Sequence, residues 1–388
     1  MRFCLFAFIG SENLGDEAIF ESVLRDLASL GPEEIGILSM NPARTRRIAR
    51  DDNMRVLAAR GARDTLSAIR RSDVFVCGGG GIFQDQTSIY NPSRYLARIQ
   101  MAHALGKKVF VYGVSVGPLS RSVNRVMAGA VLKQAACITV RDEASRSELI
   151  ALGVPAHKVH TTSDPVMNYS ATIAAPQHDP ARRKIVVCLR HWFDTIDWLP
   201  VSVVNALHLR SAENAQRYAD FVANMARVLD HLAADPRAEL EFVPFWGERD
   251  TRVHRDVLAR MTKTERCHVV GESPSPERAN AIIGDADLVV GMRLHSLIFA
   301  VANARPFFAI DYSKKVGDFL SEVLPGRVPL VSASPKDLDA ARAIAQLDRL
   351  ETASPFDDDY RARVADLKRK ERQNVALLRE LLTASGLR

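Results

Sequence analysis

Short apolar runs recur along the chain, and each is followed by a glycine or a polar turn. In the first half they cover residues 3–9, 35–40, 73–77, 108–116 and 137–140. Continuous apolar runs of this length are typical of strands buried on both faces of a parallel sheet. Helical patterns lie between them, and the clearest begins at Asp16 and ends before Gly31 and Pro32. Alternating strands and helices predict a parallel sheet with right-handed crossovers.

A second alternating set follows a break in the pattern. Residues 165–183 show little periodicity and contain Pro165, Pro176 and Pro180, which indicates an interdomain linker. Beyond it, strands are predicted at 184–189, 239–245, 287–291 and 306–310, with a helix at 212–234. We therefore predict an α/β protein with two Rossmann-like doubly wound domains facing across a cleft. Residues 1–168 form the first, 169–183 the linker, 184–357 the second, and 358–388 a basic C-terminal helix.

Composition agrees with a folded protein of this size. The 388 residues exceed the length of one ordinary domain, and 47% hydrophobic with 25% charged residues excludes long disorder. The formal charge of +6 suits an anionic small molecule or an anionic membrane surface. No zinc-finger spacing or basic stripe with interleaved aromatic residues is present, so we expect no nucleic-acid partner. No apolar run reaches the ~18 residues of a membrane span, and we expect a cytoplasmic protein.

The five cysteines are Cys4, Cys77, Cys137, Cys188 and Cys267. Their number is odd and they are far apart, which predicts buried reduced thiols and not a disulfide framework. No set of His, Cys, Asp and Glu has the spacing of a metal site, so neither a metal nor a cofactor is expected.

Polar residues gather where the predicted strands end, and in open parallel sheets ligands bind beyond these ends. In the first domain these residues are Asn13, Gly15, Asp16, Glu17, Gly78, Gly79, Gly80, Gly81, Gln84, Asp85 and Arg141. In the second they are Arg190, His191, Trp192, Arg293, His295, Lys314 and Lys315. The second set is cationic and predicts a pocket for phosphate, carboxylate or both. The glycine run fits either an oxyanion site or a plain strand-to-helix turn.

Arg293 and His295 are the strongest candidates for chemistry. They follow the strand at 287–291 and precede the apolar run 297–301. If that run belongs to a helix, its N-terminus adds free amides and partial positive charge. A histidine in such a pocket can donate or accept a proton near neutral pH.

Six segments carry a family resemblance: residues 10–18 (GSENLGDEA), 78–85 (GGGGIFQD), 140–145 (VRDEAS), 161–165 (TTSDP), 291–300 (GMRLHSLIFA) and 312–316 (YSKKV). With them the chain resembles the polysaccharide pyruvyltransferase family, particularly its cell-surface-anchoring branch. The resemblance implies a GT-B-like fold. It also implies transfer of a pyruvyl unit from phosphoenolpyruvate, as co-substrate, to a sugar, giving a pyruvate ketal and free phosphate.

The resemblance assigns donor-site positions to Arg141, Arg293, His295 and Lys315, and the cationic cluster adds Arg190. We expect the arginines and lysine to hold the two anionic groups, and His295 either to protonate the methylene carbon as general acid or to assist the departure of phosphate. The expected acceptor-side or basic residues are Asn13, Asp16, Glu17, Gly79, Gly80, Gln84 and Asp85.

Two other functions fit the same fold. A nucleotide-sugar glycosyltransferase is expected to show acidic residues late in the second domain, where Asp311 and Asp318 are the candidates. A non-catalytic carbohydrate-binding protein is expected to lose Arg293 or His295, and both are present.

The basic C-terminal helix has two interpretations. Its apolar stripe predicts packing back across the first domain with the basic face in solvent. The alternative is a peripheral contact with anionic lipid at the inner face of the membrane, which suits a lipid-linked acceptor.

Overall fold

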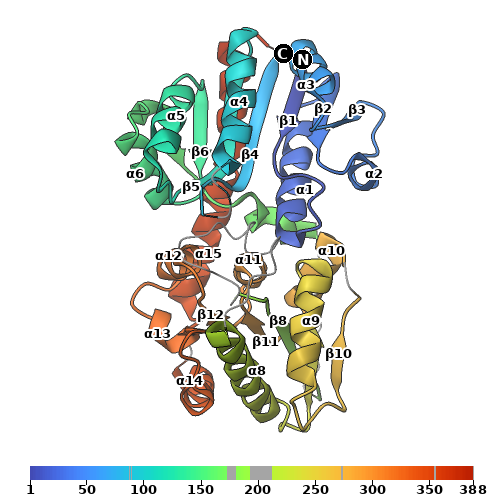
Figure 1. Ribbon diagram of the computed structural model, residues 1–388, viewed down its shortest axis with the longest axis vertical. Helices are drawn as coiled ribbons and strands as arrows, with labels where there is room; N and C mark the ends of the chain where they lie inside the picture. The colour runs from blue at the N-terminus through green and yellow to red at the C-terminus, as the bar shows by residue number, and fades with distance from the viewer. Residues whose placement is uncertain are drawn as a thin grey trace.

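The computed structural model describes residues 1–86, 88, 90–172, 181–192, 212–271, 274–353 and 355–387. The described chain forms two lobes, each a parallel sheet with helices on both faces (Figure 1). The central stretch of the predicted linker and residues 193–211 lie outside the described part.

The first lobe contains a seven-stranded sheet in the order β3-β2-β1-β4-β5-β6-β7. Its strands are β1 (Arg2–Phe6), β2 (Glu34–Ser39), β3 (Met54–Ala58), β4 (Val74–Phe83), β5 (Lys108–Val116), β6 (Cys137–Val140) and β7 (Val159–Thr161). Its helices are α1 (Leu14–Ala28), α2 (Pro42–Thr45), α3 (Ala62–Arg71), α4 (Asn91–Ala104), α5 (Ser122–Leu132) and α6 (Glu143–Ala151), followed by the 3-10 turn η1 (Ala156–Lys158). All neighbouring strands are parallel, and the strand order reverses between β1 and β4.

The second lobe repeats this architecture with a six-stranded sheet in the order β10-β9-β8-β11-β12-β13. Its strands are β8 (Arg183–Cys188), β9 (Ala238–Phe242), β10 (Cys267–Val269), β11 (Leu288–Gly291), β12 (Phe307–Ile310) and β13 (Ser332–Ala333). Its helices are α8 (Ala212–Leu232), α9 (Gly247–Leu258), α10 (Pro276–Gly284), α11 (Leu294–Ala302), α12 (Lys314–Val323), α13 (Val328–Val331) and α14 (Ala340–Ala353). The order reverses between β8 and β11, so the predicted pair of doubly wound sheets is confirmed.

The sequence suggested a strand that ends before the glycine run, but the strand continues through the glycines. β4 continues to Phe83, and Gly78 and Gly80 pair with Tyr112 and Val114 of β5. Gly79 has φ +89°, and a Cβ there would overlap with the side chain of Ile19 on α1. Glycine is required because the strand passes against the helix in a conformation that other residues rarely adopt.

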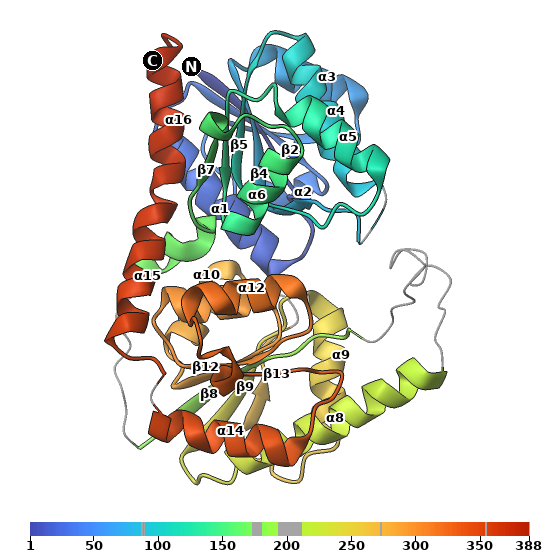
Figure 2. The ribbon, with the colours of Figure 1, turned by 90° about the vertical axis from the view of Figure 1, so that its left-hand side faces the viewer.

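The predicted C-terminal helix is two helices, α15 (Asp358–Glu371) and α16 (Gln373–Ala384), which meet at Arg372. They leave the second lobe and run along the first (Figure 2), where α16 contacts β5 and β6. The predicted packing across the first domain is therefore confirmed. Part of the basic face is paired within α15, since Arg361 contacts Asp358 at 2.7 Å and Lys370 contacts Asp366 at 3.0 Å. Among the described helices, none is long and apolar enough to cross a membrane.

The 3-10 segment η2 (Pro165–Thr172) lies between the lobes and joins their cores. The ring centroid of its Tyr169 lies 5.8 Å from that of Phe299 on α11, and Phe245 lies 6.0 Å from Phe299 on the other side. The segment η2 therefore packs against one helix from each lobe, α1 and α11.

Candidate active site

The two sheets bring their switch points face to face, and two helix N-termini meet there. Asn13 caps α1 by accepting a hydrogen bond from Gly15 N at 3.0 Å, and Leu14 N donates to Phe245 O of the other lobe at 2.8 Å. Gly15 lies against His295, and a Cβ at this position would overlap with the imidazole. The partial positive charge at the N-terminal ends of both helices therefore favours negative charge in the space between them.

Arg293 occupies the N-cap position of α11 and is held by a buried carboxylate. Asp250, in the first turn of α9, accepts hydrogen bonds from Nε at 2.9 Å and from Nη2 of Arg293. Asp250 is fully buried and also accepts from Phe245 N and Trp246 N, at 3.1 and 2.9 Å. Nη1 of Arg293 has no hydrogen-bond partner among the described residues, which leaves one edge of the guanidinium for a ligand.

Arg141 is positioned in a similar way from the other lobe. It follows β6, and its Nη1 donates to Asp164 Oδ2 at 2.6 Å while its Nε donates to Ser115 Oγ. Arg141 is 9% exposed and Asp164 is 4% exposed, so water screens this pair little. Its Nη2 makes no hydrogen bond within the described part of the chain.

His295 lies between these two arginines. Its Nε2 is buried, has no hydrogen-bond partner among the described residues, and lies 3.9 Å from Asp164 Oδ2. Burial lowers the pKa of His295 to about 4, against the opposing effect of Asp164, and Arg141 and Arg293 lower it further. The imidazole of the ligand-free site is therefore neutral near pH 7.

Asp16 and Lys315 complete the cluster. Burial raises the pKa of Asp16 to about 7 and Glu17 adds to this, although Arg141, Arg293 and Lys315 oppose the shift. Burial lowers the pKa of Lys315 to about 8, with a further contribution from Arg141. A Cβ at Gly81 would lie 2.5 Å from Lys315 Nζ, and one at Gly80 would lie 3.4 Å from Asp16 Oδ1.

Arg190 adds a further cation at the edge of the cluster. It follows β8, and its Nη1 donates to the hydroxyl of Tyr312 at 2.7 Å while its guanidinium carbon lies 4.4 Å from the centroid of that ring. Burial lowers the pKa of Arg190, and neighbouring Arg293 lowers it further. Both observations place Arg190 beside Arg293 at the carboxyl end of the second sheet.

Several acceptor-side candidates have other contacts. Glu17 Oε1 accepts from Ser11 N at 2.9 Å, and Gln84 Oε1 accepts from Gln86 N at 2.8 Å. The carboxylate of Asp85 accepts three hydrogen bonds at 2.9–3.0 Å, from Ser120 N, Arg121 N and Asn124 Nδ2. These side chains stabilise the loops around the site, and among the first-lobe carboxylates proposed as bases only Asp16 lies within the cationic cluster.

Three residues that hold the predicted arginines were not singled out from the sequence: Ser115, Asp164 and Asp250. Ser115 lies near the end of β5 and Asp164 shortly after β7, so the rule that selected the other candidates applied to them too. Asp250 lies further from its strand, in the first turn of α9, where that rule does not reach. Strands β7 and β9 are short or alternate in polarity, which made their ends hard to place.

The residues expected of a nucleotide-sugar enzyme are not poised for a ligand. Both oxygens of Asp318 accept from Lys314 Nζ, at 2.8 and 2.6 Å. Asp311 Oδ1 accepts from Ser313 N at 3.3 Å, within its own turn. A nucleophilic cysteine is also unsupported, because burial raises the pKa of the Cys4 thiol to about 12 and raises those of the other four.

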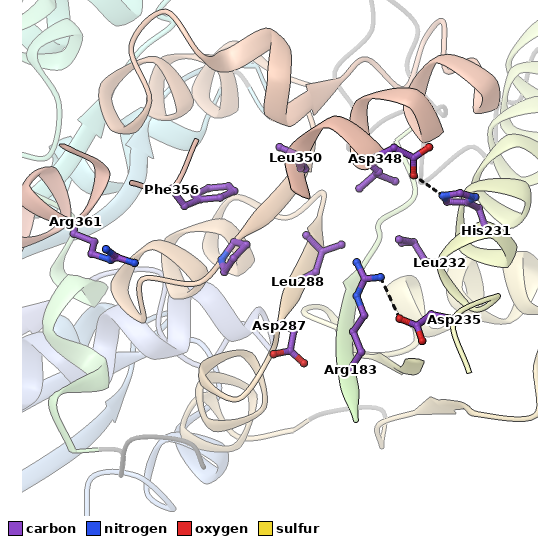
Figure 3. Close-up of a pocket in the computed structure, with 12 residues that line it drawn as sticks. Arg183, His231, Leu232, Asp235, Asp287, Leu288, Asp348, Leu350, Phe356 and Arg361 are labelled. Atoms are coloured by element: carbon purple, nitrogen blue, oxygen red, sulfur yellow. Dashed lines mark hydrogen bonds and ion pairs between the residues drawn. The ribbon is translucent and has the colours of Figure 1, made fainter. Parts of the chain in front are cut away.

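A cavity of about 570 Å³ lies at the opposite, amino edge of the second sheet (Figure 3). Four of its charged lining groups form two pairs, Arg183 with Asp235 at 3.5 Å and His231 with Asp348 at 2.8 Å, and Arg361 pairs with Asp358 outside the cavity lining. The remaining wall is largely apolar and includes Phe356. The cavity therefore lacks the convergent cations of the interlobe cluster.

Comparisons with known proteins give one family match and several fold matches. A family model described as "Polysaccharide pyruvyl transferase" matches residues 13–314, a span that contains Asp16, Arg141, Arg293 and His295. Among solved structures, the chain is similar to UDP-GlcNAc 2-epimerase from Neisseria meningitidis bound to UDP-GlcNAc, with TM-score 0.63, 10% identity, and coverage of 99% of this chain and 100% of that one. It is also similar to Anabaena Alr3699/HepE in complex with UDP-glucose, with TM-score 0.57, 11% identity and 99% coverage of both chains.

A putative UDP-N-acetylglucosamine 2-epimerase from Listeria monocytogenes has TM-score 0.61 and 11% identity, and the match covers 94% of this chain and 91% of that one. At such identities these likenesses concern the fold. Together with the two doubly wound sheets, they show that the chain has a GT-B-like architecture.

Proposed function

The chain belongs to the polysaccharide pyruvyl transferase family, and we propose that it transfers the pyruvyl group of phosphoenolpyruvate to a sugar, forming a pyruvate ketal. The acceptor is a sugar of a cell-surface polysaccharide or of its lipid-linked precursor. The observation that supports this best is the convergence of Arg141, Arg293 and Lys315 around Asp16 and beside His295.

The cationic groups suit the donor. Phosphoenolpyruvate carries a carboxylate and a phosphate. The unoccupied guanidinium edges of Arg141 and Arg293 and the ammonium group of Lys315 can bind these two anionic groups. Asp164 and Asp250 each hold one arginine through hydrogen bonds, so these cations are already oriented before the ligand arrives. Arg190 supplies additional positive charge from the second lobe.

The chemistry begins at the methylene carbon of the donor. His295 gives a proton to this carbon, and positive charge develops on the carbon that bears the carboxylate and phosphate. A sugar hydroxyl attacks the carbon that bears the carboxylate and phosphate, and releases its proton to Asp16. The product of this step is a tetrahedral intermediate. The flanking arginines stabilise the anionic groups throughout this step.

The second half closes the ring. The carbon–oxygen bond to phosphate breaks, and the leaving phosphate takes the proton that Asp16 had accepted. A second hydroxyl of the same sugar attacks the resulting cation and loses its proton. Of the two hydroxyl protons, one restores His295 and one leaves with phosphate, so donor plus diol gives ketal plus hydrogen phosphate.

Donor binding changes the protonation of the site. The pKa of His295 is about 4 without ligand because the ring is buried beside two arginines. A donor with about three negative charges offsets those arginines and raises this pKa toward neutrality. Asp16, with a pKa of about 7, is then suited to exchange protons with a sugar hydroxyl near neutral pH.

The test is an incubation of the purified protein with phosphoenolpyruvate and a panel of free, nucleotide-linked and lipid-linked sugars. We expect release of inorganic phosphate that requires the acceptor, together with a pyruvyl mass gain on the sugar. The absence of phosphate release with every acceptor, combined with turnover of a nucleotide sugar, would overturn the proposal in favour of a glycosyltransferase.

A further inference from the structure

The C-terminal helices cross the segment that connects β7 to η2. Asn374, in the first turn of α16, is fully buried; its Oδ1 accepts from Thr162 Oγ1 at 2.8 Å and its Nδ2 donates to Ser163 O at 3.3 Å. On the preceding helix α15, the carbonyl oxygen of Lys368 accepts from Asn168 Nδ2 at 2.9 Å. The C-terminal helices therefore hold residues 162–168 at several points, although they are 200 or more residues away along the chain.

The segment held in this way carries Asp164. Its Oδ1 accepts from Val166 N at 3.0 Å, which fixes the carboxylate relative to the local backbone. Its Oδ2 accepts from Arg141 at 2.6 Å and lies 3.9 Å from His295 Nε2. The position of the backbone at 162–164 thus determines where this carboxylate lies between the two site residues.

The distance of 3.9 Å is beyond a hydrogen bond, and His295 Nε2 has no other partner in the described structure. A shift of the Asp164 carboxylate by less than about 1 Å therefore decides whether it contacts the imidazole, and displacements of this size can change catalytic rates up to about 10²-fold. The position of the backbone at residues 162–164 therefore affects the contact between Asp164 and His295.

We propose that Asn374 is a positioning residue, which sets the place of Asp164 relative to Arg141 and His295 through its hydrogen bonds to Thr162 and Ser163. The inference rests on the proposed function for its catalytic consequence. Removal of the amide takes one donor from the buried carbonyl oxygen of Ser163, whereas the hydroxyl of Thr162 also donates to Val140 O at 3.2 Å.

The electrostatic consequence has a definite sign. The charged groups that face His295 are Asp164 after β7, Arg141 after β6 and Arg293 at the start of its own helix. Asp164 raises the pKa of His295, whereas the two arginines lower it. If the carboxylate moves away, the imidazolium becomes less stable, so the protonated ring is lost at a lower pH.

The test compares Asn374→Leu and Thr162→Val with Gln373→Ala, an exposed substitution one residue away on the same helix. Thr162→Val keeps the shape of the side chain and removes only the hydroxyl, so it remains informative if Asn374→Leu folds poorly. The thermal midpoint of each variant is measured first. The half-titration pH of the His295 ring is then followed by NMR, with His295→Gln used for assignment.

We expect both variants to lower the half-titration pH of His295 and to reduce kcat with phosphoenolpyruvate by about tenfold. The alkaline limb of the pH profile of kcat should move to lower pH. Because Asn374 and Thr162 share one hydrogen bond, the double variant should lose less than the product of the two single effects. Gln373→Ala should match the wild type.

A variant that has a lower thermal midpoint but an unchanged His295 titration would overturn the inference and leave Asn374 with a role in stability alone. The NMR titration does not depend on turnover. If the wild type does not consume phosphoenolpyruvate, the proposed function fails, while a shifted titration in both variants still supports the positioning of Asp164 by Asn374.

Discussion

Asp250 and Arg293 form a two-point buried pair in which the carboxylate covers one edge of the guanidinium and leaves Nη1 unoccupied. Because Asp250 also accepts from the backbone of Phe245 and Trp246, the pair links α9, α11 and the loop between β9 and α9. The arginine that is expected to bind the donor is thus part of the internal packing of the second lobe.

Replacement of Asp250 by Asn should destabilise the protein by about 3–5 kcal/mol, since it leaves a buried arginine without its counter-charge. The free energy of unfolding, measured in urea, checks this value. Asp318→Asn is the matched control: it removes an exposed partner of Lys314, and a change of at most about 1 kcal/mol is expected. Equal effects of the two substitutions would contradict the importance of the buried pair.

His295→Ala should reduce kcat for pyruvyl transfer by about 10²–10⁴-fold if the ring transfers the proton. The KM for phosphoenolpyruvate should change far less, because the arginines and Lys315 supply the charge that binds the donor. His157→Gln, an exposed histidine in η1, serves as the control. Near-normal turnover in a folded His295→Ala protein would remove the histidine from the mechanism.

Gly15→Ala tests the contact between the two lobes at the site. A Cβ there overlaps with the imidazole of His295, so the ring must shift and turnover should fall by at least about tenfold. Gly271→Ala is the matched control, because a Cβ at that position meets no atom within 4 Å. Wild-type activity of the Gly15 variant would show that the ring tolerates displacement.

Asp16→Asn should stabilise the protein at alkaline pH. Burial raises the folded pKa of Asp16 to about 7, above its value in the unfolded chain, so ionisation opposes folding. The wild type therefore loses stability as the pH rises from about 4 to about 7, and the loss persists above that range. We expect a gain of roughly 1–3 kcal/mol for Asp16→Asn at pH 8 that disappears near pH 4.

Urea unfolding at both pH values measures this difference, with exposed Asp52→Asn as the control. The same substitution should also slow sugar transfer, because the amide cannot accept the hydroxyl proton. A gain that does not depend on pH would contradict the assigned pKa shift.

Lys315 should make donor binding depend on pH. Burial lowers its pKa to about 8, so the charged form that attracts an anion is lost as the pH rises through that value. Binding of phosphoenolpyruvate, measured by calorimetry, should weaken between pH 7 and pH 9. Lys315→Met should bind the donor about tenfold or more weakly at pH 7 and should lose most of this pH dependence.

Lys314→Met is the control, since Lys314 is exposed and pairs with Asp318. A Lys315 variant that retains the wild-type decline between pH 7 and pH 9 would assign the titration to another group.

Much of this site follows from local sequence. Strand-helix alternation predicts two doubly wound sheets, and the residues beyond the strand ends include Asp16, Arg141, Arg293 and His295. Local patterns are informative here because parallel strands place their carboxyl ends along one edge, whatever the connections between them. The resemblance to a family rests on short segments at these same ends.

Tertiary structure decided which charges meet. Arg293 pairs with Asp250 across 43 residues and Arg141 pairs with Asp164 across 23, and no local periodicity encodes such distances. Packing also gave Asp85 and Glu17 hydrogen bonds to loop backbone, and brought the glycines of β4 close to α1. The sequence by itself thus determined the two sheets and the cations at their edges. Only the folded chain, by removing water and setting distances, determined the partners of those cations and the altered pKa values of His295, Asp16 and Lys315.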